Sequence, residues 1–454
     1  MFRKHPSLAA PVLFVALVAL SALVTGWILR SCTPRSERPR ILVSTDIGGT
    51  DEDDNQSMLH LLMYSDRFDI EGLVSTASYG PGSKEEILRM IDLYEQDYPV
   101  LHSHSRDFPS PERLRDLTFQ GVRGEAPLAG YGTPTEGSKR IVECARRKDS
   151  RPLWVLVWGC LEDVAQALHD APDIADRIRV YWIGGPNKKW GSNGYAYIVE
   201  HFPDLWIIEN NAAYAGFIGR RDDPGKYQMG FFDACLRGAG ACGDAVTRYS
   251  KGIVKMGDTP SILYLMTGDP ENPLEEHWGG RFEPMDISPK FLVTGPLSVR
   301  DTVPVYALME WHLRGPVVDV PADSVCLTMR VADQDWRGYH VGGGEYVVRY
   351  APKAAATLHY TITSPIPGFP EQEGDYVVAP EWPGVSMAGG WKYGVSGENI
   401  MPVPLPVGKH WYTDLYSGRG TDPDFHYLRT PMETVGKWRE EVLRDWESRL
   451  EWFK

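Results

Sequence analysis

Short, continuous apolar runs alternate with helix-like segments from residue 40 to about residue 285. The predicted strands cover residues 40–46, 70–76, 152–158, 178–183 and 205–208. Between them, apolar residues recur at helical spacing in residues 57–64, 84–98 and 161–169. Strands that are apolar throughout and separated by helices are typical of a mostly parallel sheet buried on both faces. The pattern therefore predicts an α/β fold, in which ligands bind at the carboxyl ends of the strands.

The pattern changes near residue 286. From there to about residue 425, proline and glycine are frequent, and short stretches alternate between apolar and polar residues. Three such stretches cover residues 324–331, 345–350 and 357–363. This period predicts antiparallel strands in a small sandwich-like region. In residues 434–453 the apolar positions return to helical spacing, which predicts a C-terminal helix.

The N-terminal segment predicts export. Residues 8–29 contain no charged side chain and follow the basic residues Arg3 and Lys4. As a helix, such a run is about 33 Å long, enough to span a bilayer. We therefore expect a signal or membrane anchor over residues 1–32, a polar linker over residues 33–39, and a body outside the cytoplasm. The formal net charge of −14 argues against nucleic acid as a partner, because phosphate binding needs a basic surface.

Five acids crowd into the nine residues from Asp46 to Asp54, directly after the first predicted strand. Like charges this close are unfavourable unless a cation or protons neutralise them. Calcium prefers carboxylate and carbonyl oxygens, and Gly48-Gly49 permits the sharp turn that brings these acids together. The pattern favours a calcium site. The alternative is a solvated acidic turn that caps the helix beginning near Asn55.

Several separated motifs resemble one known family. The strand leading into Thr45-Asp46-Ile47-Gly48, followed by Asp53-Asp54 and a helix, resembles the N-terminal signature of inosine-uridine-preferring nucleoside hydrolases. The sequence is closer still to an exported nucleoside-hydrolase-like subfamily whose members are often labelled cellulose-binding proteins. The further motifs that carry this resemblance are residues 44–74, Gly257-Asp258-Thr259-Pro260-Ser261, Asp269-Pro270, Trp278-Gly279-Gly280-Arg281-Phe282 and Trp438-Arg439.

The resemblance bears on the domain organisation. A nucleoside-hydrolase-like domain is expected over residues 40–285, where most of the motifs lie. A β-rich inserted or second domain is expected over residues 286–430. In the resembled subfamily the final helix belongs with the first domain, so residues 431–454 are expected to pack back on it.

The resemblance also implies a calcium site at the acidic loop. Asp46 corresponds to the aspartate that binds calcium and deprotonates the attacking water, and Asp54 corresponds to another calcium ligand. Asp258 is the candidate for the distant aspartate ligand, and Trp158 stands where a backbone carbonyl completes the metal shell. Asp53 corresponds to the aspartate that contacts a sugar hydroxyl.

Two alternatives stay open at this site. The loop is longer than the one in the family, with Thr50-Asp51-Glu52 extra, so Asp51, Asp53 and Asp54 compete for the metal and sugar roles. Asp258 directly precedes Thr259-Pro260, and its alternative role is to cap the helix that begins there.

Candidates for binding the sugar and its leaving group lie further along the chain. Ile208-Glu209-Asn210-Asn211 resembles the family stretch that grips a ribose hydroxyl, so Glu209 and Asn211 are expected to bind substrate, with Asn187 adding contacts. Trp278 is expected to stack on a base or sugar, and His277 to donate a proton to the leaving group. The alternatives are a polar turn after a strand and a structural histidine.

These features together predict a calcium-dependent hydrolase of glycosides or nucleosides that acts outside the cytoplasm. The alternative is a carbohydrate-binding protein without turnover, in which calcium is structural. In that case the β-rich region would bind sugar through Trp382, Trp391 and Trp411.

Overall fold

The computed structural model describes residues 37–219, 222–379, 399–414 and 429–454. The predicted anchor over residues 1–32 lies outside these ranges, as do Trp382 and Trp391 and most of the predicted linker. Across the described ranges, no helix combines the length and the apolar character needed to cross a membrane.

The first unit is an eight-stranded sheet in the order β3-β2-β1-β4-β5-β6-β17-β7. Neighbouring strands are parallel except for β17 and β7, which pair antiparallel. The strands are β1 (Arg40–Thr45), β2 (Asp69–Ser75), β3 (Thr118–Gln120), β4 (Leu153–Val157), β5 (Ile178–Ile183), β6 (Ile207–Asn210), β7 (Glu283–Pro284) and β17 (Trp411–Thr413). The predicted mostly parallel sheet with flanking helices is therefore confirmed.

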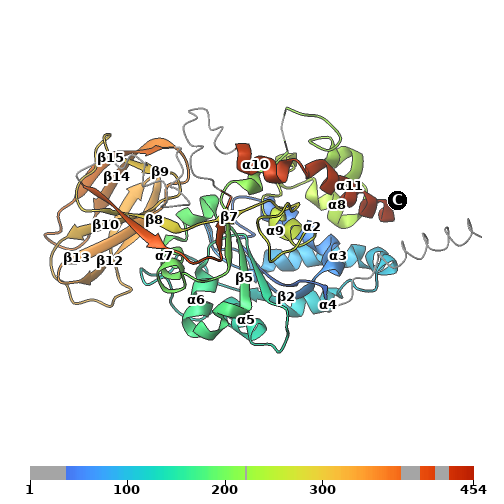
Figure 1. The fold of residues 1–454 in the computed structure, drawn as a ribbon, viewed down its shortest axis with the longest axis horizontal. Coiled ribbons are helices and arrows are strands. Elements are labelled where there is room, and N and C mark those ends of the chain that lie inside the picture. The colour runs from blue at the N-terminus through green and yellow to red at the C-terminus, as the bar shows by residue number, and fades with distance from the viewer. Residues whose placement is uncertain (1–36, 220–221, 380–398, 415–428) are drawn as a thin grey trace, which may run out of the picture.

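Helices cover both faces of this sheet (Figure 1). The helices are α2 (Asp53–Met63), α3 (Lys84–His104), α4 (Pro111–Asp116), α5 (Glu136–Ala145), α6 (Glu162–Asp170), α7 (Ser192–His201), α8 (Gly240–Val246) and α9 (Thr259–Tyr264). In β1, Ile41 and Val43 join the apolar cluster under α2, α3 and α9, whereas Leu42 joins the cluster under α5, α6 and α7. Both sides of the strand are buried, which explains why its sequence is apolar without alternation.

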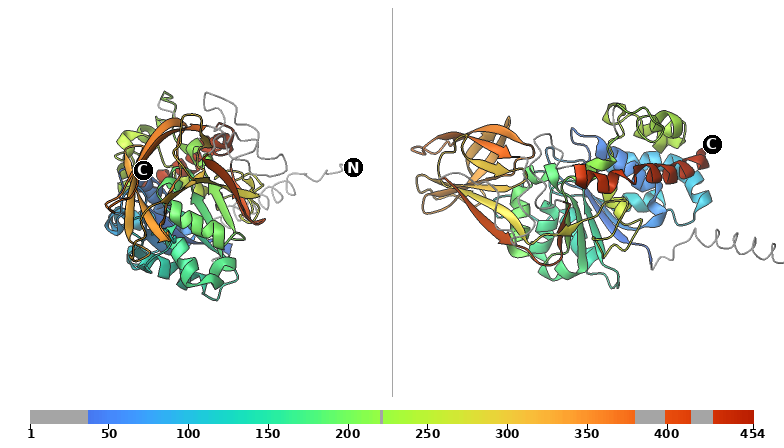
Figure 2. Two further views of the ribbon diagram at one scale, coloured as in Figure 1. Left: turned by 90° about the vertical axis from the view of Figure 1, so that its left-hand side faces the viewer. Right: turned by 45° about the horizontal axis from the view of Figure 1, so that its top comes forward.

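The second unit is a nine-stranded sheet in the order β16-β8-β10-β13-β12-β11-β14-β15-β9. Its strands are mostly antiparallel and surround a hydrophobic core of their own, at one end of the molecule (Figures 1 and 2). They are β8 (Ile287–Val293), β9 (Thr302–Pro304), β10 (Leu308–Arg314), β11 (Val325–Val331), β12 (Gln334–Gly342), β13 (Glu345–Tyr350), β14 (Ala356–Thr363), β15 (Gln372–Ala379) and β16 (Ile400–Pro406). The predicted β-rich region is confirmed.

After β16 the chain returns to the first sheet. Trp411–Thr413 forms β17, which pairs with β6 and donates a hydrogen bond from the Trp411 indole to Glu209 at 2.8 Å. Trp411 is fully buried, so the expectation that this ring stacks on sugar is wrong. Its three-residue strand is too short to stand out in a proline-rich sequence.

The C-terminal segment forms two helices, α10 (Arg429–Gly436) and α11 (Arg439–Leu450), instead of the one continuous helix expected. Both contribute buried apolar residues to the core of the first unit, including Val435 and Trp446. Arg449 extends this packing with an ion pair to Asp66 at 2.7 Å, in which both side chains are buried. Figure 2 shows α11 lying along the α/β unit, far from the β-rich end.

The buried ion pair allows the contribution of α11 to the stability of the first unit to be tested. Arg449→Ala leaves the Asp66 carboxylate buried without its partner, and we expect a loss of about 3–5 kcal/mol in unfolding free energy. The matched control is Arg444→Ala on the same helix, whose ion pair with Glu440 is exposed and should contribute little to stability. Urea unfolding of the two variants measures the difference, and equal losses would contradict this role of α11.

Candidate metal centre and active site

The acidic loop opens into a pocket of about 390 Å³ at the carboxyl ends of β1, β4 and β5. The sheet-edge rule therefore locates the cleft correctly. From the α/β unit the pocket wall includes Asp46, Asp51, Asp53, Asp54, Ser78, Tyr79, Trp158, Asn187, Trp190, Tyr214, Lys255 and Asp258. Gln334 and Lys353 of the β-rich unit complete it.

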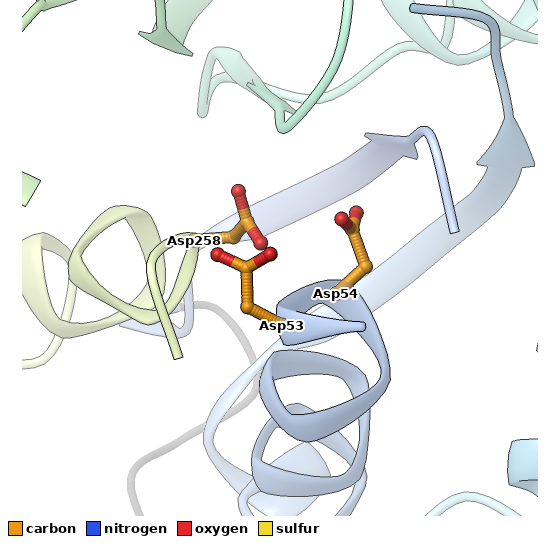
Figure 3. A group of neighbouring side chains, drawn as sticks. All are labelled: Asp53, Asp54 and Asp258. Atoms are coloured by element: carbon orange, nitrogen blue, oxygen red, sulfur yellow. The ribbon is translucent and has the colours of Figure 1, made fainter. Parts of the chain in front are cut away.

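Three aspartates converge in this pocket (Figure 3). Asp53 and Asp54 begin α2, and Asp258 stands directly before α9. Each offers one carboxylate oxygen, and these oxygens lie within 4.8 Å of one another, a spacing suited to shared metal ligation. The partial positive charge at the start of α2 favours acids there, but it does not account for the third carboxylate.

The helix-capping alternatives do not account for these acids. Asp258 occupies the position before α9, yet its side chain makes no capping hydrogen bond. Glu52, which precedes α2, makes none either. Asp258 Oδ2 is buried and has no hydrogen-bond partner among the residues that the structure describes. A buried carboxylate oxygen without a donor is costly unless a cation or a proton meets it.

Burial and mutual repulsion raise the pKa values of the carboxyls in this cluster. Burial, followed by the charges of Asp258, Asp46 and Asp53, raises the pKa of Asp54 well above its ordinary value. Burial and the charges of Asp53 and Asp46 do the same to the pKa of Asp258. For Asp53, burial raises the pKa to about 7, although Lys255 Nζ lies 3.3 Å from its carboxylate and favours the charged form. Binding of a cation to these carboxylates is therefore expected to release protons.

Asp46 lies in the same pocket, just beyond the end of β1. Its carboxylate accepts a hydrogen bond from the Ser78 hydroxyl. Burial raises the pKa of Asp46, and the hydrogen bond from Ser78 opposes that shift. Asp46 is not one of the three convergent aspartates, whereas Asp53, expected to bind sugar, is one of them.

Trp158 and Asn187 both line the pocket, as expected. The Trp158 indole donates to Ser261 Oγ at 2.7 Å, which fixes the ring in the wall. The Trp158 carbonyl accepts a hydrogen bond from Asn187 Nδ2 at 3.0 Å and has a second lone pair to offer. The same Asn187 amide also donates to the Ile183 carbonyl at 3.1 Å, so its nitrogen supports the turn.

Glu209 and Asn211 are not part of the pocket lining. Glu209 is buried beside the sheet, where Lys188 at 2.9 Å and Tyr195 at 2.6 Å hold its carboxylate. The Asn211 amide lies in the same buried network, 3.3 Å from Thr413 Oγ1. Both side chains, which we expected to bind a sugar, instead tie β6 to its neighbours in this structure.

His277 and Trp278 also lie outside the pocket lining. The His277 ring is buried and stacks on Tyr264 at 4.1 Å. Both of its nitrogens are close to backbone carbonyls, with Nδ1 2.6 Å from Thr267 O and Nε2 3.2 Å from Asn272 O. Trp278 is partly buried against the core of the first unit. The structure therefore places the expected proton donor and stacking ring outside the pocket.

Several lining residues escaped the sequence analysis. Ser78 follows β2, so the sheet-edge rule was sufficient to find it. Lys255 sits near the candidate Asp258 in sequence, but no local pattern pairs it with Asp51 and Asp53. The remaining missed residues are Tyr79, Trp190, Tyr214, Gln334 and Lys353.

Comparison with known families shows which family the chain belongs to. The family model described as "Cellulose-binding Sde182, nucleoside hydrolase-like domain" matches residues 40–282. The chain belongs to this family. A second family model, described as a domain of unknown function (DUF5060), matches residues 302–365 within the β-rich unit of this Sde182-like chain. No curated protein matches the chain.

Solved structures similar to the Sde182-like chain include a nucleoside hydrolase-related hypothetical protein from Saccharophagus degradans that is associated with carbohydrate metabolism. That match has 19% identity and a TM-score of 0.48, and covers 75% of this chain and 99% of the other. The inosine-uridine preferring nucleoside hydrolase from Bacillus anthracis matches at 15% identity and a TM-score of 0.35, covering 55% and 85%. The plant nucleoside hydrolase PpNRh1 matches at 11% identity and a TM-score of 0.37, covering 89% and 99%.

Proposed function

We propose that this protein hydrolyses glycosidic bonds with the help of a bound calcium ion and with Asp46 as the general base. The observation that carries the proposal is the convergence of Asp53, Asp54 and Asp258 in the pocket that Asp46 also lines. Buried carboxylates held this close are unfavourable for folding alone, which points to a functional role.

The residues present fit a hard cation. Three carboxylates supply oxygen ligands, the Asp258 Oδ2 atom has no hydrogen-bond partner among the described residues, and Trp158 lines the same pocket. Cysteine and histidine are missing from the convergent set within the described residues, which favours calcium over zinc. When bound, calcium would lower the pKa of a water molecule and would orient the sugar for attack by that water.

The chain's own groups then carry the reaction. Asp46, oriented by the Ser78 hydroxyl, accepts a proton from the attacking water. The water oxygen bonds to the anomeric carbon as the bond to the leaving group breaks. The leaving group takes up a proton from solvent, and Asp46 returns to solvent the proton that it accepted. The pocket carboxylates stabilise the positive charge that develops on the sugar ring.

We further propose that the substrate is a small glycoside or nucleoside met outside the cytoplasm. The apolar residues 8–29 favour export through a signal or membrane anchor. The word cellulose-binding in the family description fits a carbohydrate encountered outside the cell. It also supports the second candidate function, carbohydrate binding without turnover.

A panel assay separates these two functions. The purified full-length protein is incubated with nucleosides and glycosides in calcium buffer, and free reducing sugar is measured. We expect release from at least one member of the panel by the wild-type protein and background release by Asp46→Asn. No release from any member, with wild type and Asp46→Asn indistinguishable, would overturn the enzyme proposal and favour binding without turnover.

A further inference from the structure

A second pocket, of about 440 Å³, adjoins the first. The two pockets share Ser78, Tyr79, Gly80, Trp190 and Gln334. Because five residues line both, the second pocket is a continuation of the cleft. Its far wall comes from the β-rich unit and consists of Arg330, Asp333, Asp335, Trp336 and Arg337.

The far wall is a β-hairpin built from β11 and β12. Both residues of its turn have positive φ, 51° for Ala332 and 58° for Asp333, as a tight hairpin turn of this kind requires. Alanine disfavours that backbone conformation, so the turn holds local strain. A hydrogen bond of 3.2 Å from the Trp190 indole to Gln334 Oε1 ties the hairpin to the α/β unit. The wall is therefore held in a defined position beside the first pocket.

The shared boundary between the pockets is aromatic. Tyr79 is 54% exposed, and its ring centre lies 5.7 Å from that of Trp190. Beyond this pair the lining is rich in guanidinium and carboxylate groups, including the Arg330–Asp335 ion pair at 3.0 Å. Aromatic faces beside charged hydrogen-bonding groups match the two sides of a sugar ring, which is apolar on its C–H face and hydroxylated at its edge.

Glu125 adds a further hydrogen-bonding group to the lining of the second pocket. Glu125 lines the second pocket and accepts a hydrogen bond from Asn193 Nδ2 at 3.2 Å. Burial raises the pKa of Glu125 to about 8, although Arg337 and Arg349 favour its charged form. The raised pKa favours the protonated carboxyl, which is able to donate to a sugar oxygen.

We propose that the second pocket is the leaving-group subsite and that it binds a further sugar unit, so that the preferred substrates are disaccharides or longer saccharides. This inference rests on the proposed glycosidase function. A nucleobase would use the Tyr79–Trp190 boundary but would make no use of the hairpin's charged groups, such as Arg330 and Arg337. The β-rich unit thus acts as a specificity element, and hydrolysis transfers the sugar in the first pocket to water.

The test compares two substrates that share the same first sugar, a disaccharide and a nitrophenyl glycoside. We expect Arg337→Ala and Arg330→Ala to lower the ratio of kcat/KM for the disaccharide to kcat/KM for the nitrophenyl glycoside about tenfold, as loss of a charge-assisted hydrogen bond gives. The matched control is Arg314→Ala, a 78% exposed residue of the β-rich unit outside both pockets, which should keep the wild-type ratio. An unchanged ratio in both subsite variants would overturn the proposal.

Failure of the underlying enzyme proposal has a different outcome. If no substrate is hydrolysed, equilibrium binding of the same disaccharides to wild type and to Arg337→Ala tests the subsite directly. Weaker binding to the variant supports a saccharide subsite in the absence of turnover. Equal affinities, or no binding to either protein, would overturn it.

Discussion

Asp46→Asn is expected to reduce the rate of sugar release by a factor of about 10²–10⁴, the usual contribution of a positioned general base. The asparagine side chain has nearly the same shape and can still meet the Ser78 hydroxyl, but it cannot accept a proton from water. Because Asp46 is not one of the three convergent aspartates, the variant should still bind calcium through Asp53, Asp54 and Asp258. The measurements are initial rates of sugar release and calcium affinity by calorimetry.

The matched control for Asp46 is Glu52→Gln. Glu52 belongs to the same acidic loop but is exposed, and it does not line the pocket. The Glu52 carboxylate accepts a hydrogen bond from the Ser250 backbone at 2.9 Å, which a glutamine oxygen can also accept. We therefore expect Glu52→Gln to release sugar at nearly the wild-type rate. An Asp46→Asn protein that binds calcium and hydrolyses substrate at the wild-type rate would contradict the role of Asp46.

Asp258→Asn is expected to stabilise the calcium-free protein at pH 8 by about 1–3 kcal/mol, because a neutral amide replaces a carboxyl whose ionisation is opposed by burial and by the neighbouring carboxylates. Burial raises the pKa of Asp258 and of Asp53, to about 7 in the latter case. The folded state therefore binds more protons than the unfolded state between pH 4 and pH 7. Stability from these groups is present below pH 4 and is lost as the pH rises through their folded pKa values.

Calcium should reverse this loss in the wild-type protein. The ion replaces protons on the three carboxylates, and at one hundred times its dissociation constant it adds about 2.7 kcal/mol. The Asp258→Asn protein should gain much less from calcium. Urea unfolding at pH 5 and pH 8, in chelator or in calcium, measures these effects, with the exposed Asp233→Asn as the control. Equal calcium stabilisation of Asp258→Asn and wild type would contradict the assignment of Asp258.

The fold and the aspartate cluster were accessible from sequence for a common reason. Strands buried on both faces are continuously apolar, so β1 and β4 could be recognised, and their carboxyl ends mark the pocket edge. The dense acids after β1 then had to lie at that edge. The choice among Asp51, Asp53 and Asp54 depended on side-chain direction at the start of α2, which the loop's extra residues obscured.

Glu209, Asn211, His277 and Trp278 lie outside the pocket lining because tertiary contacts decide side-chain direction. Glu209 belongs to β6 itself, so its side chain turns to a face of the sheet, where Lys188 pairs with it. Both ring nitrogens of His277 lie close to carbonyl oxygens of the preceding loop, an arrangement that no local pattern reveals. Gln334 and Lys353 reach the pocket only because the β-rich unit docks beside it, and docking of one unit on another leaves no periodic pattern in the sequence.

The central claim is that calcium held by the aspartate cluster is required for hydrolysis. It is tested most directly by the rate of sugar release from one substrate of the panel as a function of free calcium concentration, for wild type and for the Asp54→Asn/Asp258→Asn double variant. We predict that the wild-type rate rises from background and saturates, and that the double variant stays at background over the same range. A wild-type rate that is unchanged after complete removal of calcium, or a double variant with the wild-type calcium dependence, would contradict the account.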